Sequence, residues 1–129
     1  MVQVSGEHLM VTQIVLDMLN LPLEKARERT RLQGVTVKRQ RAYYLIRELT
    51  NGKMSYPAIG LVFERDHSSV IYGYDVIAKM AESSPVFKSG LRRELELARM
   101  KIEEILLRAK TRVSYEDYVA SAAMDMVAV

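Results

Sequence analysis

Apolar residues recur every three or four positions along most of this chain, and strict alternation of apolar and polar residues is rare. That spacing predicts helices. Turn-forming residues are few, with 6 Gly and 3 Pro against 8 Met in 129 residues, and this composition also favours helices over a many-turned β-sandwich. The length suits one domain. We therefore expect a single all-α domain.

Capping residues and breaks divide the chain into expected helices. These span about residues 5–20, 22–31, 38–49, 56–63, 67–81 and 87–110. Gly34 is expected in a loop, and Thr50-Asn51-Gly52 is expected to stop the third helix. The tail over 111–129 is short and partly apolar, so it either docks as a small helix or stays mobile.

The expected helices at 56–63 and 67–81 are the most informative pair. Ser55 is a suitable N-cap for the first and Pro57 suits its first turn, while Asp66 is a suitable N-cap for the second. Two short helices joined by about three residues form a helix-turn-helix pattern. The pattern alone is weak evidence, because most helix pairs with short turns bind no DNA.

Positive charge is concentrated ahead of this pair. The segment 25–53 carries nine Lys and Arg against two acids, a net charge of +7, whereas the whole chain carries +3. A solvated charged face is the usual origin of such a run. Here the excess directly precedes the helix-turn-helix pattern, where positive charge would neutralise DNA phosphates. Together the two features predict DNA binding.

The start of the second helix has the chemistry of a major-groove reader. Asp66 can accept from cytosine, His67 can hydrogen-bond a base or pack on a thymine methyl, and Arg65 can donate to guanine or phosphate. Ser68 and Ser69 can reach bases or phosphates. The alternative is structural: Asp66 caps the helix and the serines are ordinary first-turn residues. The residues alone leave both interpretations open.

Signals for catalysis and for bound metals are missing. Gly52-Lys53 is not a phosphate-binding loop, because Arg47 and Met54 stand where that motif needs Gly and Ser or Thr. Asp66-His67-Ser68-Ser69 cannot form a catalytic triad, since neighbours on one helical turn diverge. The chain has no Cys and only 2 His, which argues against a zinc site. We expect no enzyme, no cofactor and no metal.

The sequence also shows no recognisable signal for targeting to another compartment. Its first basic residue is Lys25, and Gln13 and Asp17 interrupt the apolar stretch that precedes it, which argues against a signal peptide. No run approaches the ~20 apolar residues of a membrane span. We expect a soluble, cytoplasmic, nucleoid-associated protein without membrane partners.

Four short motifs stand in the central part of the chain. They are Arg39-Gln40, Arg47-Glu48-Leu49-Thr50-Asn51, Pro57-Ala58-Ile59-Gly60 and Arg65-Asp66-His67-Ser68-Ser69-Val70. In this order they resemble the C-terminal DNA-binding domain of the bacterial replication initiator DnaA, over roughly residues 8–97. The resemblance implies a Trp-repressor-like helix-turn-helix domain over 1–97, with 98–129 continuing the long C-terminal helix and tail of the same unit.

The resemblance also implies a partner and a role for each matching position. The partner is double-stranded DNA with an A/T-rich box similar to TTATCCACA. Asp66, His67 and Ser68 would read bases in the major groove, and Arg31 would reach the minor groove. The positions that would contact the DNA backbone are Arg39, Gln40, Arg47, Pro57, Arg65 and Ser69.

The chain departs from the family pattern at several positions. Its turn is one residue shorter and contains Glu64, and Asp75-Val76 stands where the family commonly has Arg-Lys. Ser68 and Ser69 replace threonines. Because no phosphate-binding loop is present, we expect a DNA-binding domain without ATPase activity. Such a protein would regulate transcription or compete with the initiator at its boxes.

The long C-terminal helix supports a second hypothesis. Its apolar residues step by four and three positions, as in a coiled coil, through Leu91, Leu95, Ala98, Ile102, Ile105 and Ala109. This stripe either packs on its own domain or forms a homodimer seam. The alternative function is an interaction or dimerisation module that has lost DNA binding through Glu64, Asp75 and Val76.

Overall fold

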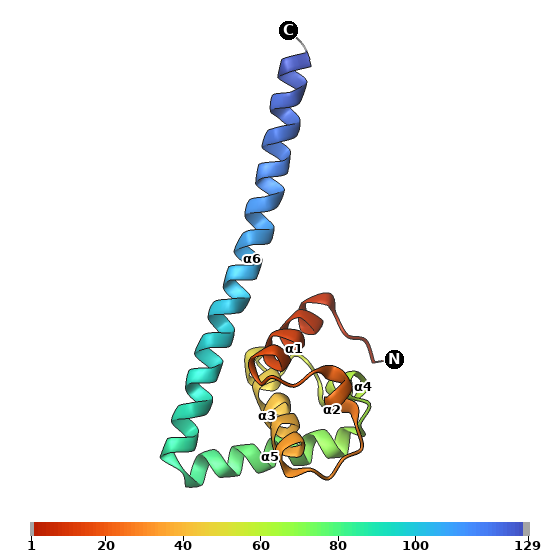
Figure 1. Ribbon diagram of the computed structural model, residues 1–129, viewed down its shortest axis with the longest axis vertical. Coiled ribbons are helices and arrows are strands. Elements are labelled where there is room, and N and C mark those ends of the chain that lie inside the picture. Colours follow the sequence, from red (N-terminus) through yellow and green to blue (C-terminus); the bar gives the residue numbers. More distant parts are fainter. Residues whose placement is uncertain (1, 128–129) are drawn as a thin grey trace. The chain divides into compact units, whose positions relative to one another are not determined.

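A computed structural model describes the backbone of residues 2–127 and the side chains of residues 2–110. This part of the chain contains helices and no strand. The helices are α1 (Gly6–Met18), α2 (Leu23–Arg27), α3 (Gln33–Leu49), α4 (Tyr56–Phe63), α5 (His67–Ser83) and α6 (Pro85–Val127) (Figure 1). The predicted all-α class is confirmed.

The chain divides into two units, residues 1–99 and residues 100–129. The first unit holds α1 to α5 and the beginning of α6. Within it α3 packs against both α1 and α5, and α4 packs against α5 (Figure 1). The second unit is the remainder of α6. None of the helices described here combines the length and apolar character that a membrane span requires.

The core of the first unit is built from one apolar face of each helix. Its largest fully buried side chains are Val15, Leu16, Leu45, Ile46, Met54, Ile59, Phe63, Val70, Ile77 and Leu91. Tyr43 meets Phe63 edge to face, with ring centroids 5.1 Å apart, and so joins α3 to α4. A Cβ atom on Gly73 would lie 2.8 Å from the Tyr43 ring, so this glycine lets α5 approach α3 closely.

Most predicted helix boundaries are confirmed by the capping contacts. The hydroxyl of Ser5 accepts from the His8 amide, and the hydroxyl of Ser55 accepts from the Ala58 amide at 3.2 Å. After α3, Asn51 and Gly52 take positive φ angles of 51° and 75°, a backbone turn that ends the helix.

Two local predictions are wrong. The second helix ends at Arg27 instead of Arg31, because Glu28 is already extended and its carbonyl accepts from Arg39 and Arg65. The third helix begins at Gln33 instead of about Lys38, so Gly34 lies in the first turn of α3 and not in a loop. First-turn amides lack intrahelical partners in any helix, and the packing of α3 on both neighbours outweighs the weak propensity of one glycine.

The apolar stripe of α6 begins inside the chain's own core. Leu91 is 2 % exposed and Ala98 is 1 % exposed, and Leu95 packs against the same cluster. An ion pair between Arg41 and Glu94 adds a polar contact from α3. The helix extends past the predicted end at 110 and continues to Val127. The side chains of the predicted tail lie outside the described residues.

Candidate nucleic-acid interface

A tight turn of residues 64–66 connects α4 to α5. Glu64 adopts a left-handed conformation with φ 55°, and the Arg65 amide donates to the Gly60 carbonyl at 2.8 Å. A Cβ atom on Gly60 would lie 2.4 Å from the Arg65 carbonyl oxygen. The two helices therefore approach each other at a point where only glycine fits without a shift, which fixes the geometry of the helix-turn-helix.

The first turn of α5 presents four consecutive exposed polar residues, Asp66, His67, Ser68 and Ser69. Asp66 occupies the N-cap position, but its carboxylate makes no capping hydrogen bond to α5. It lies 3.3 Å from Nδ1 of His67. The alternative prediction, that the Asp66 side chain caps α5, is therefore wrong. Its acceptor oxygens face solvent beside the imidazole.

Two guanidinium groups anchor the loop that carries Arg31. Arg65 and Arg39 donate to the same carbonyl of Glu28, at 2.6 and 3.1 Å, and Arg39 also donates to the carbonyl of Ala26 at 2.8 Å. These bonds hold the segment after α2 against α3 and the turn. Arg31 follows in this loop and is exposed. The loop and the start of α5 are therefore positioned by the same two side chains.

The same two arginines create a local excess of positive charge. Arg39 is only 8 % exposed, and its pKa is lowered first by burial and then by the nearby charge of Arg65. No ion pair with a carboxylate involves either guanidinium among residues 2–110. Because like charges repel in this partly desolvated site, a bound anion would be favourable there.

A hollow of about 420 Å³ opens between α3 and α5 beside these arginines. It is lined by Thr36, Arg39, Gln40, Tyr43, Arg65, Ser68, Ser69 and Tyr72. Guanidinium, amide and hydroxyl donors converge on it, which is the donor set that binds a phosphate group. Five of the predicted site residues are brought together here, two of them on α3, one in the turn and two on α5.

A second hollow of about 390 Å³ lies along α4 and the turn. It is lined by Val2, Pro57, Gly60, Leu61, Glu64, Arg65, Asp66 and His67. It therefore brings Pro57 together with Asp66, the N-cap of α5, and His67, its first residue. Glu64, the acid expected to disfavour DNA, has its carboxylate 3.6 Å from Nε of Arg27. That ion pair offsets part of its charge at this edge of the site.

Arg47 lies apart from both hollows. Its Nη1 donates to the carbonyls of Gly52 and Met54, at 2.8 and 3.1 Å, and its guanidinium stacks 4.1 Å from the ring centroid of Tyr56. In this structure the side chain stabilises the loop between α3 and α4. A contact with the DNA backbone requires part of this network to be shared or released.

The sequence did not predict a role at the site for three residues that lie near it. Tyr72 lines the first hollow and is exposed, and its position four residues after Ser68 places it on the same face of α5, so spacing would have revealed it. Arg27 donates to the Val62 carbonyl at 2.9 Å and ties α2 to the end of α4. Arg27 is one of the nine basic residues of the segment 25–53, but the sequence gives no sign of its contact with α4, and Thr36 carries no signal in the sequence alone.

The family of this domain follows from comparison with known proteins. The family model described as the bacterial dnaA protein helix-turn-helix matches residues 9–77, more than half of the chain and all of α2, α3 and α4. This chain belongs to the bacterial DnaA helix-turn-helix family. The matched part of the chain is therefore a DNA-binding helix-turn-helix of the DnaA type.

Replication initiators of the DnaA type are among the relatives that match this chain. The chromosomal replication initiator protein DnaA of Symbiobacterium thermophilum is 37 % identical over 94 residues, covering 72 % of this chain and 20 % of that protein. The corresponding protein of Caldanaerobacter subterraneus is 35 % identical over 101 residues, covering 78 % and 20 %. The match spans about a fifth of the length of these relatives.

Proposed function

We propose that this DnaA-like domain recognises a specific A/T-rich box in double-stranded DNA. The first turn of α5 enters the major groove, where Asp66, His67 and Ser68 read base edges. Arg31 reaches the adjacent minor groove from its loop. The observation that carries the proposal is the shared anchor of Arg39 and Arg65 on the Glu28 carbonyl, which holds the loop beside α5.

The hollow between α3 and α5 is the proposed seat of a backbone phosphate. Gln40 and Ser69 line it together with the anchoring guanidinium groups. A phosphate there would relieve the repulsion between the two arginines and would set the depth at which α5 enters the groove. Phosphate contacts fix position, whereas the exposed residues of the first turn supply sequence preference.

The proposed role is occupancy of DnaA-type boxes without ATP hydrolysis. Gly52-Lys53 does not satisfy the phosphate-loop pattern, and the family match covers only the helix-turn-helix portion of its relatives. A domain of this kind, located at the nucleoid, would regulate transcription at box-containing promoters or compete with an initiator for its boxes.

Fluorescence anisotropy tests the proposal directly. The chain is titrated against a duplex containing TTATCCACA and against a shuffled duplex of the same composition, at near-physiological salt. We expect a preference of ~10³-fold or more for the box. His67→Ala should reduce this preference by ~1–3 kcal/mol, while Ser89→Ala, exposed on α6, should leave it unchanged. Equal affinity for both duplexes would contradict the proposal.

A second proposed function is self-association through α6. Its supporting observation is that Leu97, Met100 and Leu107 are 50 %, 65 % and 64 % exposed on this helix. A domain that binds neither duplex but associates would be an interaction module. A domain that does both would bind DNA as a homodimer.

A further inference from the structure

The apolar residues of α6 fall on two different faces. Leu91, Leu95 and Ala98 pack on the core of the first unit, so the first half of the predicted seam is occupied within the chain. Leu97 and Met100 point elsewhere and are at least half exposed. Because α6 is unbroken from Pro85 to Val127, residues three and four apart share a face along it.

The outward face forms its own heptad stripe. Steps of four and three residues connect Val86, Gly90, Arg93, Leu97, Met100, Glu104 and Leu107. Every one of these residues is exposed, and Val86 is the most exposed of the large apolar residues at 83 %. Four of the seven positions carry large exposed apolar side chains, and two carry opposite charges. Exposed apolar residues at heptad spacing are typical of a helix that packs on another helix.

The order of residues in this stripe is self-complementary when two copies run antiparallel. A two-fold axis between positions 98 and 99 places Leu97 opposite Met100 of the second copy and Arg93 opposite Glu104 of the second copy. Gly90 falls opposite Leu107 of the second copy, and a Cβ atom on Gly90 would meet nothing within 4 Å, so there is room for the larger side chain. Isologous dimers require this kind of self-complementarity.

A parallel in-register pair has no such match. It would place Arg93 against Arg93 of the second copy and Glu104 against Glu104 of the second copy. Like charges in facing positions cost free energy, whereas opposite charges set orientation and register. The charge pattern therefore selects the antiparallel arrangement.

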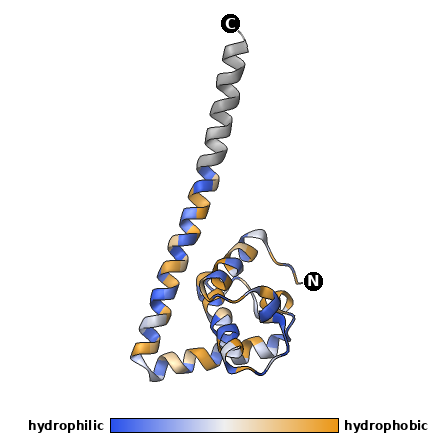
Figure 2. Ribbon diagram, in the orientation of Figure 1, coloured by the Kyte–Doolittle hydropathy of each residue, from blue (hydrophilic) through white to orange (hydrophobic). Residues whose placement is uncertain are grey.

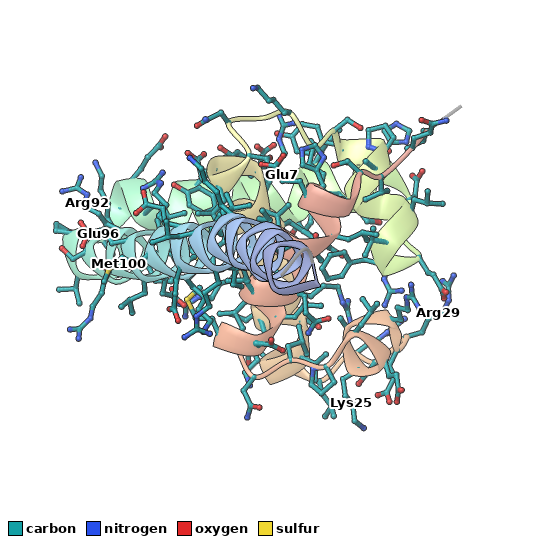
Figure 3. All side chains as sticks on the ribbon, turned by 90° about the horizontal axis from the view of Figure 1, so that it is seen from above. Glu7, Lys25, Arg29, Arg92, Glu96 and Met100 are labelled. Atoms are coloured by element: carbon teal, nitrogen blue, oxygen red, sulfur yellow. The ribbon has the colours of Figure 1, made fainter. Side chains whose placement is uncertain are left out.

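The flanks of the stripe are compatible with this pairing. On one flank Glu96 comes near Glu103 of the second copy, and Arg92 and Arg99, each four residues before one of these acids, offset that like-charge contact. Figure 3 shows Arg92 and Glu96 pointing away from the helices that form the core. The carboxylate of Glu104 already contacts Lys101 and Arg108 at 3.8 and 2.7 Å. Exposed pairs of this type contribute little by themselves, so the carboxylate can also accept from a second copy.

We propose that two copies of this chain dimerise through an antiparallel pairing of α6, along the stripe from Val86 to Leu107 with Arg93 and Glu104 as reciprocal ion pairs. The inference deepens the second proposed function and rests on it. It does not depend on DNA recognition, because α5 and the loop carrying Arg31 contribute no residue to the stripe. The partner that fits the stripe is a second copy of this chain, because under two-fold symmetry each Arg93 faces Glu104 of the other copy.

Reciprocal charge reversal tests the pairing. Sedimentation equilibrium of the full chain, without DNA, should show a dimer, and R93E or E104R alone should each weaken association by at least about tenfold. R93E leaves two acids facing each other, and E104R leaves two arginines. An equimolar mixture of the two variants should associate again as a heterodimer, since both of its cross-pairs then join Glu to Arg.

The controls separate this result from misfolding and from the DNA proposal. Both substituted side chains are exposed, so thermal melts should match wild type, and Lys88→Glu, a charge reversal outside the stripe, should leave the dimer intact. A monomeric wild type, unaffected single variants or a mixture that stays monomeric would each overturn the inference. Box preference is read separately by anisotropy, so either proposal can fail alone.

Discussion

At the scale of single residues, arginines in one basic segment perform different tasks according to their burial. Arg39 is 8 % exposed and satisfies carbonyls of Ala26 and Glu28, whereas Arg31 is exposed in the loop that those bonds hold. Removing the first leaves the Ala26 carbonyl without its donor, and the Glu28 carbonyl keeps only its bond from Arg65. Removing the second takes away a cationic group that faces solvent.

This difference gives a paired prediction. Arg39→Met should lower the free energy of unfolding by about 2–4 kcal/mol, because carbonyls that paired with a charged donor lose it. Arg31→Ala should change the free energy of unfolding by less than about 0.5 kcal/mol but reduce box preference. Urea denaturation and anisotropy of the same two variants measure both effects. A stable Arg39→Met protein with a flatter salt dependence would instead show that Arg39 acts mainly on phosphate.

The sequence identifies the basic segment but cannot assign these tasks. The partners of Arg39 are main-chain carbonyls, which every residue possesses, and they lie 13 and 11 positions away. The identities of the residues at positions 26 and 28 therefore do not predict that Arg39 bonds to their carbonyls. Asp66 illustrates the reverse case, because its type predicts a cap, yet the carboxylate lies beside His67 instead.

At the scale of elements, the helix-turn-helix was predictable because its signals are local. Ser55, Pro57 and the charged turn are adjacent in sequence to the boundaries that they define, and the structure confirms α4 and α5 there. The length of α2 and the start of α3 were not predictable, since distant arginines decide where the intervening loop is extended. Local capping chemistry cannot report such long-range bonds.

Two glycines test how tightly the helix-turn-helix is built. Gly60→Ala places a Cβ atom 2.4 Å from the Arg65 carbonyl oxygen, so the turn must shift. We expect a loss of about 1–3 kcal/mol in the free energy of unfolding, together with reduced box preference. Gly34→Ala meets nothing within 4 Å in α3 and should stabilise by up to about 1 kcal/mol. Thermal melts compare the two; equal stability would show that the turn accommodates the added methyl group.

At the scale of the whole molecule, periodicity located α6 but could not say what covers each of its faces. The predicted stripe of Leu91, Leu95 and Ala98 has coiled-coil spacing, and the core of the chain's own first unit buries it. The spacing of apolar residues shows that a helix has an apolar face, but the spacing is the same whether that face packs on its own domain or on a second molecule. Figure 2 shows hydrophobic and hydrophilic residues interspersed along the coloured part of α6, so hydropathy alone does not distinguish its two faces there.

In a two-fold dimer the two helix-turn-helix domains, one in each copy, would have inverted orientations. The preferred DNA of such a dimer would therefore be an inverted repeat. Duplexes with two boxes as inverted repeats, over a series of spacings, should bind the wild type cooperatively at one or more spacings, whereas direct repeats should bind without cooperativity. R93E should bind a single box like wild type but lose cooperativity on the inverted pair, because only the second copy is lost. Mixing R93E with E104R should restore cooperativity. Cooperative binding by R93E alone would place the contact between copies outside α6.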